Sequence, residues 1–170
     1  MKQSANLFAP VAVGRHTLAN RIVMAPMTRS RADDDGVPTE WVARYYAQRA
    51  SAGLLISEGI YPSPMGKGYI HTPGLHSDPQ VAAWKRVTDA VHAEGGRIFA
   101  QIMHAGRISD PSFLPGGATP VAPSAVRPDG QSYTADGPKP HVTPRALETD
   151  EIAGIVEEYR NATRRALEAG

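Results

Sequence analysis

The chain has 170 residues, with 18 lysines and arginines against 17 acidic residues and a formal net charge of +1. This length predicts one domain that buries roughly 70% of the surface of its unfolded chain, and the weak net charge argues against binding to nucleic acid or anionic membrane. There is no cysteine, which excludes disulfides and thiolate metal ligands.

The first 30 residues predict a small hairpin and then a strand. Apolar residues over 7–13 and the breaker pair Gly14–Arg15 favour a hairpin with its turn at that pair. The apolar run Ile22–Met27 predicts a buried strand. The strand should end near Pro26, because proline lacks the N–H that a central strand donates. Residues 27–28 would then lie at the rim of a sheet, where a hydroxyl and backbone groups can face a ligand.

Two helix and strand pairs follow. The apolar periodicity predicts a helix that begins near Thr39 and ends near Gly53, and another that begins at Ser77 and ends at Gly95–Gly96. A strand is expected after each helix, over Leu54–Tyr61 and Arg97–His104.

The C-terminal third predicts a long excursion and a last helix. Residues 105–148 are dense in proline and glycine, and they are too many for a structureless loop in a compact domain, so we expect a short hairpin or a lid. Thr149 is expected to cap a helix with the clearest helical periodicity in the chain. Alternating strands and helices favour a parallel sheet with outer helices. Three such strands leave both edges and one face of the sheet uncovered.

Several charged residues have a structural interpretation. Glu58 interrupts an apolar strand and needs a partner, for which an arginine such as Arg29, or a residue at the opposite end of the sheet, is expected. The acidic run 33–35 lacks the spacing of a calcium loop. The histidines match no zinc spacing, so no metal site is predicted, although His104 follows a strand end and is a candidate to line a cavity. No run reaches the length of a membrane span, and we expect a cytoplasmic protein.

Five segments together resemble the N-terminal half of the Old Yellow Enzyme family of FMN-dependent ene-reductases. In chain order they read LFAPVAVGRHTLANRIVMAPMTRSRA, YYAQRASAGLLISEG, KGYIHTPGLHS, AAWKRVTDAVHAEGGRIFAQIMHAGRIS and TPRALETDEIAGIV. They cover nearly the whole chain and are most similar to the N-ethylmaleimide reductase and pentaerythritol tetranitrate reductase branch. Each segment alone is weak, whereas the five in order are specific.

The resemblance implies the N-terminal part of a TIM (β/α)8 barrel, with about three β/α units and FMN at the carboxyl ends of the strands. It implies that NAD(P)H supplies a hydride, which passes through the flavin to an activated alkene such as an enone or maleimide, or to a nitro compound. The residues matching flavin contacts are Ala25, Pro26, Met27, Thr28, Gly59 and Gln101. Those matching the substrate cavity are Tyr69 and Met103.

Two residues depart from the family pattern, and several family residues lie beyond this stretch. Gly59 stands where many relatives have alanine, and Met103 where the closest branch has tryptophan, which should reshape the substrate pocket. The family's substrate-holding histidine pair (or histidine and asparagine) and its proton-donating tyrosine match nothing here. The chain is therefore expected to act with a C-terminal half-barrel. The alternatives are a non-catalytic assembly module that pairs with a second copy, and a different flavin or nicotinamide barrel enzyme.

Overall fold

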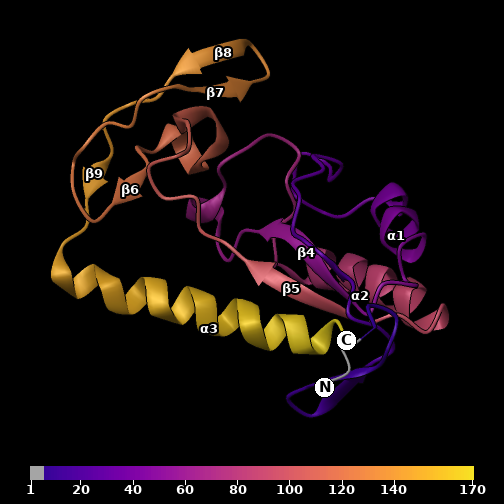
Figure 1. The fold of residues 1–170 in the computed structure, drawn as a ribbon. Coiled ribbons are helices and arrows are strands. Elements are labelled where there is room, and N and C mark those ends of the chain that lie inside the picture. The colour runs from indigo at the N-terminus through magenta and orange to yellow at the C-terminus, as the bar shows by residue number, and fades with distance from the viewer. Residues whose placement is uncertain (1–5) are drawn as a thin grey trace.

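A three-stranded parallel sheet forms the centre of the computed structural model, which describes residues 6–170 (Figure 1). The strands lie in the order β3, β4, β5, with bounds Val23–Met24, Leu54–Ile60 and Ile98–Ile102. Helices α1 (Glu40–Ala47) and α2 (Asp78–Ala93) join this sheet in one core. The predicted parallel sheet with outer helices is confirmed.

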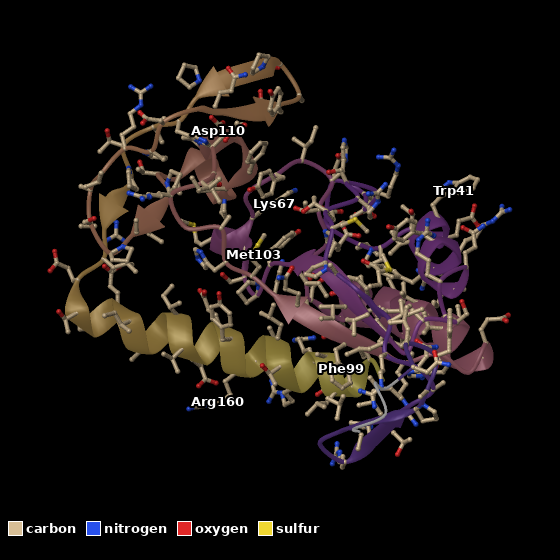
Figure 2. All side chains as sticks on the ribbon, viewed as in Figure 1. Trp41, Lys67, Phe99, Met103, Asp110 and Arg160 are labelled. Atoms are coloured by element: carbon tan, nitrogen blue, oxygen red, sulfur yellow. The ribbon has the colours of Figure 1, made fainter. Side chains whose placement is uncertain are left out.

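The core lies between the sheet and the two helices. Tyr46 of α1 and Trp84 of α2 meet over β4, with their ring centroids 6.3 Å apart. The opposite side of the sheet is open: Phe99 of β5 has 43% of its surface exposed. Figure 2 shows Phe99 on the side of β5 toward the N-terminal hairpin. The expectation of an uncovered face is therefore met by the structure.

The first strand of the sheet is shorter than predicted. Pairing between β3 and β4 covers only Val23 with Leu54 and Met24 with Leu55, whereas the sequence predicted a strand over 22–27. The ladder ends at Met24, and Pro26, two residues further on, cannot continue it because proline has no N–H to donate. Residues 25–28 therefore leave the sheet as an extended rim without ladder hydrogen bonds.

Both predicted helix starts are confirmed, while α1 ends earlier than expected. Thr39 is the N-cap of α1, but the helix stops at Ala47 and a turn leads to Gly53. A Cβ at Gly53 would lie 2.1 Å from the carbonyl oxygen of Asn20, so this glycine serves a close backbone approach rather than a helix end. Helix α2 begins with a capping box of Ser77 and Gln80.

The N-terminal hairpin is confirmed with its turn as predicted. Strands β1 (Val11–Val13) and β2 (His16–Leu18) pair antiparallel, with Val13 opposite His16. The two intervening residues form the turn, and Gly14 adopts a φ of 55°, a conformation that glycine tolerates readily.

Residues 105–148 contain short elements that extend from the sheet toward the upper left of Figure 1. Strands β7 (Gln131–Thr134) and β8 (Gly137–Pro140) form an antiparallel hairpin, while β6 (Val121–Ala122) pairs in parallel with β9 (Arg145–Ala146). Two short 3-10 turns, η2 (Pro111–Phe113) and η3 (Pro115–Gly117), lie in the same segment, while a further one, η1 (Pro64–Gly66), lies in the loop after β4.

The last helix, α3 (Ile152–Glu168), forms as expected but differs in its cap and in its buried face. A 3-10 turn, η4 (Thr149–Glu151), precedes it, and the capping box uses Glu148 rather than Thr149. Most of its predicted apolar stripe faces outward, and Leu167 has 76% of its surface exposed. Helix α3 runs along the free edge of β5, and among the described elements its main contacts are with β5, α2 and η4 (Figure 1). Within the described residues, no helix is long and apolar enough to cross a membrane.

Candidate functional site

The carboxyl ends of β3, β4 and β5 meet at one rim of the sheet, and most of the predicted cofactor residues lie there. Gly59 and Gln101 are paired neighbours on β4 and β5. Residues 25–28 follow directly after β3. Parallel strands place their carboxyl ends at the same edge, which is where TIM-barrel enzymes build their sites. The structure therefore brings together six of the eight predicted site residues at the rim formed by three adjacent strands: Gly59 and Gln101 lie on β4 and β5, and residues 25–28 follow β3. It places Met103 just beyond β5.

The two departures from the family pattern contact each other. A Cβ built on Gly59 would lie 2.6 Å from Cε and 3.1 Å from Sδ of Met103. The backbone of Met103 is fixed by its N–H, which donates to the carbonyl oxygen of Ile60 at 2.9 Å. The side chain of Met103 therefore occupies the space above Gly59, at the end of β5 (Figure 2).

We expect Gly59→Ala to displace the Met103 side chain and to lower the free energy of unfolding by about 1 kcal/mol or less. The cost stays small because a methionine side chain bends easily. Urea unfolding of this variant, of Met103→Ala and of the double variant measures the coupling. Gly154→Ala is the control, since its Cβ meets nothing within 4 Å on α3, and it should be stabilising. Additive effects at positions 59 and 103 would contradict the contact.

The amide of Gln101 is free to bind a ligand. Its backbone N–H donates to Oγ of Ser57 at 3.0 Å, a bond that replaces a ladder bond where the register shifts between Ile56 and Gly59. Within residues 6–170 the Gln101 side chain forms no hydrogen bond, although it is partly buried. The amide is not fully buried and is bound by no other part of the described chain, so it is accessible to a bound molecule.

The rim segment after β3 presents open polar and apolar groups. Met27 has 45% of its surface exposed, and Ala25 and Thr28 are exposed as well, whereas Pro26 is half-buried. The hydroxyl of Thr28 has no hydrogen-bond partner in the part of the chain that the structure describes. The small Ala25, the partly buried Pro26, the exposed Met27 and the free Thr28 hydroxyl thus form one wall of the candidate site.

Tyr69 lies on a loop that is tied to the same rim. The N–H of Ala32 donates to the carbonyl oxygen of His71 at 3.0 Å, and the N–H of Ala105 donates to that of Gly66 at 3.0 Å. These bonds fasten the loop to the segments that follow β3 and β5. The Tyr69 ring itself is 40% exposed, and the described residues give it no ring partner. The structure thus places Tyr69 near the rim but does not join it to Met103.

Glu58 is fully buried beside the rim. Its Oε2 accepts a hydrogen bond at 3.0 Å from the backbone N–H of Arg29, so the expected partner is correct but acts through its main chain. Its Oε1 is buried without a partner among the described residues. Burial raises the pKa of the Glu58 carboxyl, against the backbone hydrogen bonds of Arg29 and Ser30 and the positive charges of Arg29 and Arg31.

His104 is turned into its own loop at the end of β5. Its Nδ1 accepts from the N–H of Gly106 at 2.9 Å, which leaves the proton on a buried Nε2 that has no partner within residues 6–170. Burial lowers the pKa of this imidazole, although the nearby carboxylate of Glu158 opposes the shift. His104 is thus held neutral, and it lines the protein interior behind the rim.

Asn20 positions the first strand, and sequence reasoning missed it. Its Oδ1 accepts from the N–H groups of Ile22 and Gly53 at 3.0 and 2.8 Å, and its Nδ2 donates to the carbonyl oxygen of Ser51 at 2.9 Å. An asparagine that bonds the backbone two residues on is a known turn signal, but the bonds to Ser51 and Gly53 come from the fold alone.

Comparison with known proteins shows the same fold in flavin enzymes. The sequence profile of the NADH:flavin oxidoreductase / NADH oxidase family matches residues 6–170. The chain is 47% identical to 12-oxophytodienoate reductase 7 of Oryza sativa subsp. japonica, covering 99% of this chain and 44% of that protein.

Two solved structures give the same result. The chain is 51% identical to morphinone reductase in complex with tetrahydroNAD, with a TM-score of 0.93, covering 98% of this chain and 47% of that one. It is also 51% identical to the Old Yellow Enzyme homologue from Zymomonas mobilis, with a TM-score of 0.94 and coverage of 98% and 46%. These neighbours are TIM barrels, so the three β/α units are part of such a barrel. The chain belongs to the NADH:flavin oxidoreductase / NADH oxidase family and spans somewhat less than half the length of these relatives, at their N-terminal side.

Proposed function

We propose that this chain is the N-terminal half of an FMN-dependent ene-reductase that uses NAD(P)H to reduce an activated alkene, such as an enone or maleimide, or a nitro compound. One observation carries the proposal. The ends of three adjacent strands bring together Gly59, the Gln101 amide and the Thr28 hydroxyl, and neither of these polar groups has a hydrogen-bond partner among the described residues. The family to which the chain belongs consists of flavin oxidoreductases.

The groups at the rim fit a planar flavin. The pyrimidine edge of a flavin alternates hydrogen-bond donors and acceptors, which a Gln101 amide and the backbone of residues 25–27 can match. The Thr28 hydroxyl is able to donate to a ring carbonyl. The small Ala25 side chain leaves room for a flat ring close to the backbone, whereas at Gly59 the Met103 side chain would have to move to admit one. When bound, the flavin supplies the hydride relay between reduced nicotinamide and substrate, while the protein orients it and tunes its electron density.

The substrate side of the proposed site is formed by Met103 and Tyr69. Met103 lies over Gly59 with a flexible thioether in the space that a larger side chain would fill. Tyr69 lies on the loop that connects the rim segments. This arrangement favours a wider cavity at Met103.

The proposed partner is a C-terminal half-barrel. The free edges of β3 and β5, the exposed Phe99 and the outward apolar side of α3 are surfaces that a closed barrel covers. The same surfaces support a second candidate, a non-catalytic half-barrel module that pairs with another copy of itself. Both candidates bury the open face, but only the first one completes a flavin site.

Reconstitution distinguishes the two candidates. The chain is mixed with the C-terminal half of morphinone reductase, whose N-terminal half is 51% identical to this chain over the matched region, and the complex is isolated by gel filtration. Retained flavin absorbance and alkene-dependent oxidation of NADH or NADPH are expected, and a complex that holds no flavin would contradict the first candidate. Light scattering of the chain alone, without flavin, would show a stable dimer if the second is correct. A cytoplasmic location is also part of the proposal, and cell fractionation tests it.

A further inference from the structure

We infer that Glu58 is a positioning residue whose buried carboxylate holds the Thr28–Arg29 peptide, and so sets the place of the Thr28 hydroxyl at the rim. The inference rests on the proposed function only where it concerns the cofactor. The contact itself belongs to the chain and is testable without flavin.

The Glu58 carboxylate binds the rim segment just beyond the point where the hydrogen bonds of the sheet end. The last ladder pair between the first two strands joins Met24 to Leu55, and residues 25–28 continue without ladder bonds. The next bond between these segments is the one from the N–H of Arg29 to Oε2 of Glu58, at 3.0 Å. Residues 25–28 are therefore held at one end by the Met24–Leu55 pair and at the other end by the Glu58 carboxylate.

The bonded N–H belongs to the peptide unit that contains the carbonyl group of Thr28. A trans peptide is planar and rigid, so fixing its N–H restricts the position of the preceding Cα. A hydrogen bond to Arg29 N–H thereby restrains Thr28, whose own hydroxyl is left free to bind a ligand.

Glu58 is itself held firmly from the other side. Its backbone N–H donates to the hydroxyl oxygen of Tyr46 at 2.7 Å, and Tyr46 is fully buried in α1. The Tyr46 ring packs edge-on to Tyr45 and lies against Trp84, with centroids 5.2 and 6.3 Å away. Glu58 thus connects the rim to the core cluster that contains Tyr46 and Trp84.

An ion pair does not explain the burial of this carboxylate. Arg29, Arg31 and Arg44 line a cavity of about 410 Å³ together with Glu58, yet within the described residues none of them forms a salt bridge with it. The Arg29 guanidinium lies instead over the Tyr45 ring, 5.0 Å from its centroid. Burying a carboxylate is costly, and the hydrogen bond to the rim offsets part of that cost.

Amide hydrogen exchange on the 170-residue chain tests the contact directly. In Glu58→Met, which keeps the length of the side chain but has no oxygen acceptor, the Arg29 amide should exchange about tenfold faster. In Glu58→Gln, which keeps an acceptor, exchange should stay near the parent rate. If the methionine variant does not fold, Glu58→Asp withdraws the acceptor by one methylene and should give the same loss. Unchanged Arg29 protection in the folded variant would overturn the inference.

The consequence for the cofactor is measured in the reconstituted barrel. Glu58→Met should weaken FMN binding about tenfold and alter the visible spectrum of the bound flavin, and Glu58→Gln should restore both. Glu40→Gln, on the exposed side of α1, is the matched control and should change neither. Equal spectra in all variants would overturn the positioning role. A parent barrel that binds no FMN would instead refute the proposed function, while the exchange result still decides the Glu58 contact.

Discussion

Replacing Trp84 by alanine should lower the free energy of unfolding by about 3–5 kcal/mol. The indole has only 3% of its surface exposed, and its Nε1–H donates to the carbonyl oxygen of Gly74 at 3.1 Å. It also packs against Tyr46 in the cluster that joins both helices to the sheet. A domain is stable by only about 5–15 kcal/mol, so this variant should be partly unfolded at 37 °C. Denaturant unfolding followed by circular dichroism measures the change.

The second tryptophan supplies the control for this experiment. Trp41 lies on the outer side of α1 with 61% of its surface exposed (Figure 2). Trp41→Ala should change the free energy of unfolding by no more than about 0.5 kcal/mol. Similar losses for both variants would show that the core is not centred on Trp84.

Gln101→Leu should weaken FMN binding about ten- to a hundredfold in the reconstituted barrel and leave the stability of the chain nearly unchanged. The leucine keeps the volume of the side chain but removes the amide. A polar group of the bound flavin would then be buried without a hydrogen-bond partner, which costs about 1–3 kcal/mol of binding free energy. The stability should be little affected because the amide bonds nothing within residues 6–170. Flavin fluorescence titration measures the affinity.

Gln131→Leu provides the matched control, since Gln131 is exposed on the β7–β8 hairpin and distant in the chain from the rim. It should not alter flavin affinity. A Gln101→Leu barrel that binds FMN as tightly as the parent would remove Gln101 from the proposed cofactor site. A loss of stability in that variant would show that the amide serves the core instead.

The order of elements followed from local patterns. Thr39 and Ser77 marked helix starts because each can serve as an N-cap before an apolar period. Pro26 limited the first strand because it lacks an N–H. The cluster of Gly59, Gln101 and residues 25–28 also followed, since strands of a parallel sheet bring their carboxyl ends to one edge.

The partners of buried polar groups did not follow from the sequence. Arg29 was expected to pair with Glu58 through its charge, but the backbone N–H makes the bond. Gln80 was not predicted to be buried, although it caps α2 and donates to the carbonyl oxygen of Asp35 at 2.8 Å. These two bonds join residues that are 29 and 45 positions apart in the chain. A pattern of neighbouring residues cannot predict such distant partners.

The sequence alone determined the order of helices and strands and the strand ends at which the candidate site residues lie, because capping, proline and apolar periodicity act over a few neighbouring residues. Only the tertiary structure decided that Met103 fills the space at Gly59, that Glu58 holds the rim, and that the apolar side of α3 faces outward. A helical period shows that a face is apolar, but what covers that face depends on elements brought together by the whole fold.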